Sequence, residues 1–417
     1  MFKKIDRNQL IFFGGLIGFF LLVQILRFAG VITSFLGTIL NLGTVLAIVS
    51  IGLNLIYGFN GQFSLGQWGF YAIGAYTAAD ITYRWTNEGD TSALVVLLLT
   101  VILVGLAILI LYRTLSRIRG LDSLSAFVVY LAAAILLTYV SVFLGRILTP
   151  VFNAILGFLP SAVSFTLVYL FAVLIAGLVA AEISFLFGLP VLTLGSDYFG
   201  IATLGFTIIV KVLLDNSDTM FGFVEMKGAR GMIGIPRVTD WGWFAVFGFL
   251  FLVILVTRNL LHSSYGRAIV SVREDEIAAK AMGIDVGFYK TLTFVIGSLF
   301  AGLGGGLYAH INGFLHPDTF NFIRSFDPLI VIVFGGLGSI TGTVAASYAY
   351  LIVVEFILRQ ILPQGFENWR FVVFPVLLLI MMLTKPNGLF GNYEIPFLRQ
   401  LLPPVKKKTA SAEEVSK

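Results

Sequence analysis

Long apolar segments recur along the whole chain and limit it to folds that satisfy their backbone hydrogen bonds inside a lipid bilayer. Of the 417 residues, 58% are hydrophobic and only 12% are charged, whereas about a quarter of the residues in a soluble domain are charged. Many windows hold ~20 predominantly apolar residues, which is enough for a helix to cross the hydrocarbon core. The sequence therefore predicts an all-α polytopic membrane protein, a bundle of about 10–12 transmembrane helices.

Twelve segments are candidate spans: 10–29, 37–57, 65–81, 93–112, 124–145, 163–187, 198–214, 241–261, 291–311, 326–338, 340–358 and 371–384. Two of them, 326–338 and 371–384, are too short for a comfortable crossing, and we expect them to be tilted or re-entrant. The first run is longer than the ~7–15 apolar residues of a signal peptide, so we expect it to be retained. Residues 1–400 are expected to form one transmembrane domain, followed by a polar, disordered tail over 401–417.

Basic residues gather in four polar stretches, and these set the predicted orientation. Short cytoplasmic loops are enriched in Lys and Arg, and the stretches are 1–7, 113–119, 262–290 and 385–408. Twelve alternating crossings put all four on the same side of the membrane. We therefore expect a multi-pass protein of the cell (inner) membrane with both termini in the cytoplasm and the loop 215–240 on the outer face.

The most charged interval, His262–Lys290, lies between two apolar segments. Ser271 and Glu274 have the spacing of a capping box, in which the two side chains satisfy N–H groups at a helix start. Gly283 can adopt the left-handed conformation that ends a helix. These signals predict an amphipathic helix over 272–283 at the membrane surface, with one face available to a partner. Its apolar stripe has the spacing i, i+4, i+7 and consists of Ile277, Ala281 and Ile284.

Many of the 44 glycines cluster inside apolar segments, at 58–74, 302–306 and 335–342. Small residues let helix backbones approach closely in lipid, as in the pair Gly302 and Gly306. Alternatively, glycines allow broken, re-entrant helices that line a polar path, since irregular backbone is tolerated only around a cavity. Both interpretations stay open. The stretches 59–64 and 334–339 share the spacing F-x-G-x-x-S, which is weak evidence of an internal repeat.

Five ionisable residues lie within predicted spans, and each is a functional candidate because charge inside a bilayer is costly. They are Glu182, Asp197, Lys211, Asp327 and Glu355. Three of them, Asp197, Lys211 and Asp327, lie near segment ends and are expected to be hydrated. The two glutamates lie deeper and are expected to pair with polar groups in the bundle.

Signals of catalysis are missing from the sequence. It has no cysteine, its three histidines are scattered, and no G-x-x-x-x-G-K-[ST] phosphate-binding loop occurs. The sequence therefore predicts a protein that is not an enzyme, with no catalytic residues, no metal site and no cofactor.

An ordered set of motifs resembles a known family. The motifs lie at Gly52–Gly58, Gly61–Gly66, Gly69–Tyr76, Gly188–Leu194, Asp197–Gly205, Gly228–Pro236, Tyr265–Ile269, Arg273–Ala279, Met282–Ile284, Phe334–Gly342 and Lys385–Gly391. Together they resemble the permease subunits of branched-chain amino-acid ABC importers, most closely the LivM type, whose relatives import urea and short-chain amides. The resemblance covers roughly 37–82 and 188–391.

The resemblance implies a membrane-spanning subunit that moves branched-chain or other apolar amino acids by alternating access. The implied partners are a homologous second permease, two cytoplasmic ATPases, an external solute-binding protein and membrane lipid, with no nucleic acid. The implied ATPase-coupling residues are Arg273, Glu274, Asp275, Glu276, Ala278, Ala279 and Gly283. One departure is that Ile277 stands where the family's coupling signature usually has an acid. The path is expected to include Gly61, Gln62, Ser64, Gln67, Asp197 and Asp327.

A second departure is the interval 91–160, which is much shorter in most family members. Here it holds an additional apolar pair, expected to form a peripheral helical hairpin that faces lipid. The alternatives for the whole chain are a urea or amide permease, an ion-coupled secondary transporter acting alone, and a passive channel.

Overall fold

The computed structural model describes residues 33–115, 123–220, 226–237 and 242–358 without interruption, together with short pieces within 14–30 and 376–398. Half of the predicted span 10–29, most of the predicted span 371–384 and all of the predicted tail 401–417 lie outside the described residues.

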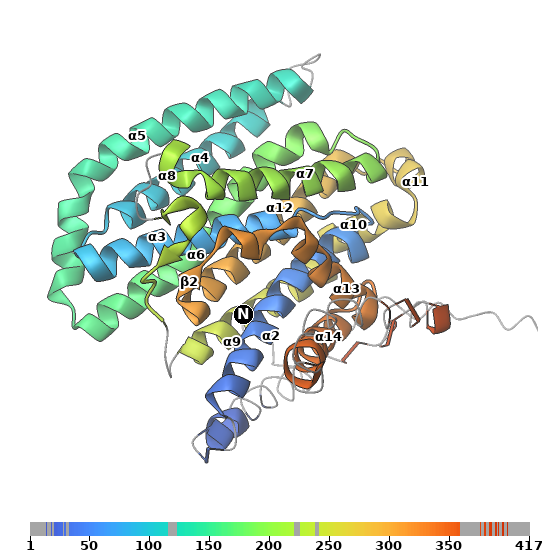
Figure 1. Ribbon diagram of the computed structural model, residues 1–417. Helices are drawn as coiled ribbons and strands as arrows, with labels where there is room; N and C mark the ends of the chain where they lie inside the picture. Colours follow the sequence, from blue (N-terminus) through green and yellow to red (C-terminus); the bar gives the residue numbers. More distant parts are fainter. Residues whose placement is uncertain are drawn as a thin grey trace, which may run out of the picture.

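Nearly every described element is a helix (Figure 1). The longer α-helices are α2 (Ser34–Leu53), α3 (Gln67–Glu88), α4 (Ser92–Leu115), α5 (Ser123–Phe158), α6 (Ser161–Val191), α7 (Ser196–Asp215), α9 (Gly242–His262) and α12 (Val286–Asn312). The shorter ones are α8 (Ser217–Met220), α10 (Ser264–Glu274), α11 (Glu276–Ala281), α13 (Phe326–Gly335) and α14 (Ile340–Leu351). Two π-helices, η1 (Asn54–Phe59) and η6 (Ile352–Ile357), extend α2 and α14. Three 3₁₀ turns, η3 (Gly228–Arg230), η4 (Pro317–Phe320) and η5 (Phe322–Ser325), and two strands, β1 (Met232–Ile233) and β2 (Phe314–Leu315), complete the described elements.

Seven helices of the described part are long and apolar enough to cross a membrane, which confirms the predicted all-α polytopic class. Most observed bounds lie within a few residues of the predicted spans, as in Ser161–Val191 for 163–187. The span predicted at 124–145 is too short, because α5 continues through Pro150 to Phe158. Proline is tolerated inside membrane helices, where neighbouring groups satisfy the freed carbonyl.

Glycines hold the centre of the bundle together, where α12 packs against α2, α3 and α6. A Cβ atom on Gly305 would lie 1.9 Å from the carbonyl oxygen of Tyr71 in α3, and one on Gly74 would lie 2.2 Å from that of Gly302. On Gly297 it would lie 2.7 Å from the carbonyl oxygen of Gly52 in α2. Such contacts bring backbones together, as expected of small residues in membrane bundles.

The bundle has two ends, marked by α11 and α8 at opposite ends of α7 (Figure 1). We call them the α11 end and the α8 end. At the α8 end, β1 pairs antiparallel with β2 and ties the loop after α8 to the loop after α12. Lys211 of α7 bridges Asp215 at 2.7 Å and Asp318 of η4 at 3.0 Å. The Lys211 ammonium holds the pKa of the Asp318 carboxyl below its ordinary value.

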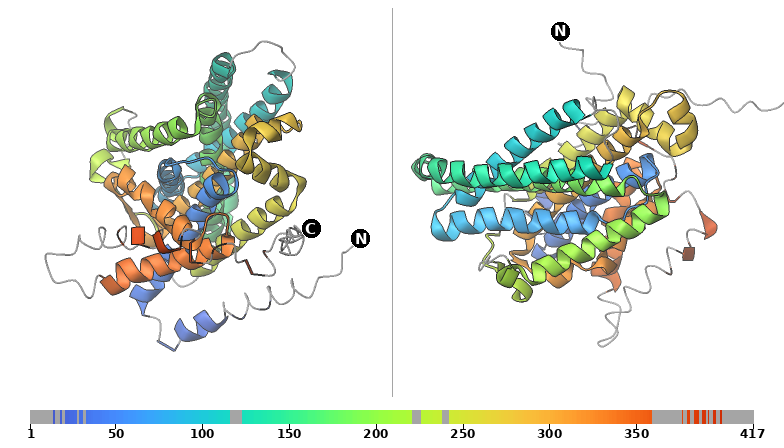
Figure 2. Two further views of the ribbon diagram at one scale, coloured as in Figure 1. Left: turned by 90° about the vertical axis from the view of Figure 1, so that its right-hand side faces the viewer. Right: turned by 90° about the horizontal axis from the view of Figure 1, so that it is seen from above.

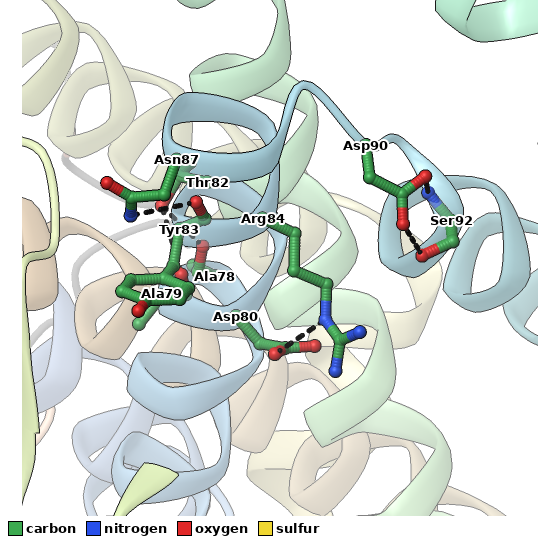
Figure 3. A network of polar contacts seen from close by, with 9 residues as sticks. All are labelled: Ala78, Ala79, Asp80, Thr82, Tyr83, Arg84, Asn87, Asp90 and Ser92. Carbon is green, nitrogen blue, oxygen red and sulfur yellow. Dashed lines mark hydrogen bonds and ion pairs between the residues drawn. The ribbon is translucent and has the colours of Figure 1, made fainter. Parts of the chain in front are cut away.

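The helices α4 and α5 form a hairpin on one side of the bundle, away from α13 and α14 (Figures 1 and 2). Only 17% of the apolar window of each hairpin helix is buried, so most of this surface faces outward. Figure 3 shows where the hairpin joins α3. In α3, Arg84 pairs with Asp80 at 3.1 Å, and at the start of α4 Asp90 accepts a hydrogen bond from the backbone N–H of Ser92 at 3.0 Å.

Candidate functional site: a broken helix, a coupling element and two cavities

The segment expected to contact an ATPase, residues 264–283 (called the coupling element from here on), consists of the two helices α10 and α11 instead of the single helix predicted over 272–283. The first, α10, begins at the N-cap Ser263 and ends at Glu274. The backbone is extended at Asp275, whose carboxylate accepts hydrogen bonds from the N–H groups of Ile277 and Ala278, both at 2.9 Å. The predicted cap at Ser271 is therefore wrong. Its hydroxyl lies within α10 and donates to the carbonyl oxygen of Ala268 at 2.8 Å, while Asp275 is the N-cap of α11.

The end of α11 agrees with the sequence analysis. Lys280 lies in its last turn, and Gly283 has the left-handed φ of 83°. The helix is held to the bundle by Ala279, which packs with Val272 and Val286. On the outward side, Ile277 and Met282 are each 83% exposed. Of the predicted apolar stripe, Ile277 and Ala281 are exposed, whereas Ile284 is half-buried against this cluster.

The acidic residues of this element have different tasks. Asp275 caps α11, and Glu276 pairs with Lys290 of α12 at 2.6 Å. Glu274 is exposed at the end of α10. Two of the three acids therefore hold the element's own structure.

A break in the first core helix faces the coupling element. After α2 and η1, residues 60–66 have no regular structure, and Gly61 has a φ of 79°. This broken segment is fixed by hydrogen bonds, from the Leu65 N–H to the Thr203 hydroxyl at 3.0 Å and from the Asn60 amide to the Thr293 hydroxyl at 3.0 Å. Irregular backbone and π-helices inside a bundle are typical of functional sites.

Arg273 joins this break to a second one, which follows α13. Its guanidinium donates a hydrogen bond to the carbonyl oxygen of Gly58. It also lies against Gly338, where a Cβ atom would be 3.2 Å from Nη1, and against Gly61, where a Cβ atom would be 3.4 Å from the Arg273 Cα. We call the meeting point of these residues the junction. Both glycines have a positive φ, which disfavours other residues there, and both lie in close contact with Arg273, so the breaks and the coupling element fit each other.

Asn54 ties the two breaks together directly. Its side chain donates to the Ser339 carbonyl oxygen at 3.0 Å and to the Thr343 hydroxyl at 2.9 Å, and it accepts from the Gly338 N–H at 2.9 Å. A Cβ atom on Gly58 would lie 1.7 Å from the Asn54 Oδ1. The two stretches that share F-x-G-x-x-S, 59–64 and 334–339, thus meet at the junction.

A polar cavity of about 200 Å³ opens beside the junction. Its lining includes Gly61 and Gln62 from the broken segment, and Lys290 of α12. The coupling element contributes Arg273, Glu274, Asp275 and Glu276. The structure therefore brings two predicted path residues together with the first four predicted coupling residues. Ser64 and Gln67 are buried in or next to the broken segment but do not line this cavity.

A second cavity of about 300 Å³, which we call the aromatic cavity, is lined by α2 on one side and by Trp68, Tyr71 and Tyr308 on the other. Arg324 and Asp327 contribute charge to its lining, with 3.2 Å between Nη1 and Oδ2. The Tyr350 hydroxyl donates to the other oxygen of Asp327 at 2.9 Å. The predicted hydration of Asp327 is wrong, because its side chain is only 14% exposed and ion-paired.

Sequence reasoning missed Arg324, Trp68, Tyr308 and Tyr350. Only the spacing of Arg324 and Asp327 carried a signal, since residues three apart meet on one helix face. The other three come from distant parts of the chain.

The remaining ionisable candidates lie elsewhere. Glu182 lies in α6 beside Gly105 of α4, where a Cβ atom would be 3.4 Å from its Oε1, and Lys211 is ion-paired at the α8 end. The side chains of Asp197 and Glu355 lie outside the described residues. Among the residues that the structure does describe, no group of three or more His, Cys, Asp or Glu could hold a metal ion.

These helices, breaks and cavities define a multi-pass α-helical membrane protein with polar sites inside its bundle. A family model described as "Branched-chain amino acid transport system / permease component" matches residues 35–154 and 114–383. The chain belongs to this family.

Individual relatives agree with the family match. The chain is 34% identical over 271 residues to the high-affinity branched-chain amino acid transport system permease protein LivM of Escherichia coli K12, covering 57% of this chain and 59% of that protein. It is 26% identical over 253 residues to a probable LivM permease of Methanocaldococcus jannaschii, covering 58% and 72%. It is also 29% identical over 143 residues to LivH of Escherichia coli K12, covering 34% and 45%. The match thus spans about three fifths of the bacterial LivM relative. No solved structure matches the chain.

Proposed function

We propose that the protein is the membrane-spanning permease subunit of an ATP-driven ABC importer that takes up branched-chain or other apolar amino acids. The observation that carries the proposal is the contact of Arg273 with Gly58 and Gly338. Through it, the surface element 264–283 reaches both breaks in the core helices. A conformational change imposed by another protein at the α11 end would reach the translocation path through this contact.

In this proposal the protein lies in the inner cell membrane, and its α11 end faces the cytoplasm. One of the two ATPases docks on α11 and on the exposed end of α10, where Ile277 and Met282 offer apolar contacts. A homologous second permease completes the membrane part, and relatives named both LivM and LivH support such a pair. A solute-binding protein docks at the α8 end, on the loops joined by β1 and β2.

Alternating access would follow from the junction. When the ATPases close, α11 and α10 move together, because Asp275 and the pair Glu276–Lys290 fix them to each other and to α12. Arg273 then shifts the broken segment 60–66 and the break after α13. Since α3 and α13 start or end at these breaks, the motion continues into the bundle.

The test is purification of the tagged protein from its native membrane. We expect two ATPases and a second permease to co-purify, and amino-acid uptake in vesicles to stop when ATP is removed. Uptake that follows an ion gradient with ATP depleted, and a preparation that never contains an ATPase, would overturn the proposal. Replacement of Glu274, Asp275 and Glu276 together should uncouple uptake from hydrolysis while the protein still inserts in the membrane. Normal transport by that variant would rule out a coupling role for these acids.

A further inference from the structure

The aromatic cavity is lined by aliphatic, aromatic and charged side chains. Its volume of about 300 Å³ lies at the lower end of the range for small-molecule sites. The wall from α2 is mostly aliphatic, with Ile39, Leu42, Val45, Leu46 and Val49 beside Phe35 and Thr38. The facing wall is aromatic, and the rim near η5 and α13 is charged. A ligand that fills it therefore has an apolar part and a charged part.

The aromatic wall is fixed in place. The Trp68 indole donates to the carbonyl oxygen of Thr319 at 3.0 Å and stacks on Tyr71 with 4.6 Å between ring centroids. Tyr71 in turn contacts Tyr308 at 5.4 Å between ring centroids. A preorganised wall binds without the entropic cost of ordering side chains.

The charged rim contains one positive and one negative side chain, which form an ion pair. Arg324 and Asp327 bear opposite charges 3.2 Å apart, and their side chains are 36% and 14% exposed. A net anion or cation would be repelled by one of them. A zwitterion fits both, since a guanidinium binds a carboxylate through two parallel hydrogen bonds and a carboxylate binds an ammonium.

We propose that the aromatic cavity binds an apolar zwitterionic amino acid within the permease itself. Its carboxylate contacts Arg324, its ammonium contacts Asp327 beside the Tyr350 hydroxyl, and its side chain lies against Val45, Leu46 and Val49. The inference rests on the proposed function and specifies its substrate class. Urea and short amides have neither the two charges nor the apolar part. They would therefore offer no charged group to Arg324 and Asp327 and no apolar surface to the α2 wall.

The cavity also connects to the junction. Trp68 is the second residue of α3, directly after the broken segment, and Asp327 is the second residue of α13, which ends next to Gly336–Gly338. Arg273 contacts Gly61 in the broken segment and Gly338 after α13. From Asp327 to the end of α13 the distance is about 12 Å at 1.5 Å per residue. A shift of Arg273 would therefore move both the aromatic wall and the charged rim.

The test uses the complete transporter in proteoliposomes, with ATP inside and the binding protein loaded with L-leucine or L-valine outside. We expect Arg324→Gln and Asp327→Asn each to lower uptake of both amino acids about tenfold or more. The matched control is Asp80→Asn, which breaks another Asp–Arg pair of 3.1 Å with similar exposure (Figure 3). It should keep near-normal uptake. An equal loss in the control, or normal uptake in both cavity variants, would overturn the cavity site.

A second variant separates binding from folding. Val49→Leu adds one methylene to the aliphatic wall and should lower the ratio of leucine to valine uptake about tenfold, as one methylene does in a tight pocket. An unchanged ratio would count against the site even if total uptake fell. The wild type distinguishes the two proposals: if it takes up no amino acid with ATP, the proposed function fails. If it does so and the variants do not differ from it, only the cavity assignment fails.

Discussion

The guanidinium of Arg273 donates a hydrogen bond to the carbonyl oxygen of Gly58, which lies 215 positions earlier in the chain. The bond joins the last turn of α10 to the π-helix η1. Gly58 is the last but one residue of this π-helix, directly before the broken segment. The carbonyl of Gly58 is therefore satisfied by the coupling element, and a displacement of that element acts on the first core helix without an intermediate.

Arg273→Gln should uncouple transport. The variant loses a charged hydrogen bond of about 1.5–3 kcal/mol, and the shorter side chain no longer reaches Gly338. We expect ATP hydrolysis by the assembled transporter to continue while uptake per ATP falls about tenfold. The measurement is paired hydrolysis and uptake in the same proteoliposomes.

Arg267→Gln is the matched control, since Arg267 is exposed on the same helix α10. It should leave the ratio of uptake to hydrolysis unchanged. If both variants lower the ratio of uptake to hydrolysis equally, the loss of a surface charge explains the effect, and the junction does not transmit the coupling.

The sequence predicted helices well and contacts poorly, and the reasons are physical. Apolar length specifies a span, so α6, α9 and α12 appear near their predicted bounds. Several nearby side chains can act as the N-cap of one helix, and a local pattern does not decide between them. Here Asp275 caps α11, whereas the Ser271 hydroxyl bonds within α10. The charged partner of Asp327 is three residues away but lies outside the predicted span 326–338, in η5. Contacts such as that of Asn54 with Ser339 join residues 285 positions apart, and no local pattern encodes them.

Asn54→Ala should destabilise the protein. Asn54 is 1% exposed and makes three hydrogen bonds to the loop and helix after the second break. Its removal leaves the Gly338 N–H without its acceptor, at about 1–3 kcal/mol for an unsatisfied group, whereas the Ser339 carbonyl oxygen still accepts from Thr343. Thermal unfolding in detergent should show a midpoint several degrees lower. Asn87→Ala, which removes an exposed amide bonded to Tyr83 at 3.1 Å (Figure 3), should unfold like the wild type. Equal midpoints for both variants would show that Asn54 is not a structural link.

Ile277→Ser combined with Met282→Ser should weaken ATPase retention without affecting folding. Both side chains are 83% exposed, so the folded subunit loses little buried area. We expect the ATPase to be lost during purification of the tagged variant, while its unfolding midpoint is retained. Ile233→Ser, at a 55% exposed position of β1 at the other end of the bundle, should retain the ATPase. Full retention by the double variant would mean that the apolar face of α11 is not the docking surface.

Gly305→Ala should abolish transport through packing alone. The new Cβ atom would lie 1.9 Å from the Tyr71 carbonyl oxygen and 2.8 Å from the Ala75 nitrogen. Backbone atoms cannot yield by changing rotamers, so α3 has to move away from α12. Overpacking of this kind costs about 1–3 kcal/mol or more, and the displaced α3 includes Trp68 and Tyr71 of the aromatic cavity. We expect low yield in membranes, and no uptake by the protein that is recovered.

The control is Gly248→Ala in α9, where an added Cβ atom meets nothing within 4 Å. Alanine favours a helix over glycine by up to about 1 kcal/mol, so this variant should express and transport at least as well as the wild type. Comparison of the two variants separates the effect of close backbone contact from the effect of helix propensity. If Gly305→Ala transports normally, α3 and α12 can separate freely, and the rigid core that the junction acts on does not exist.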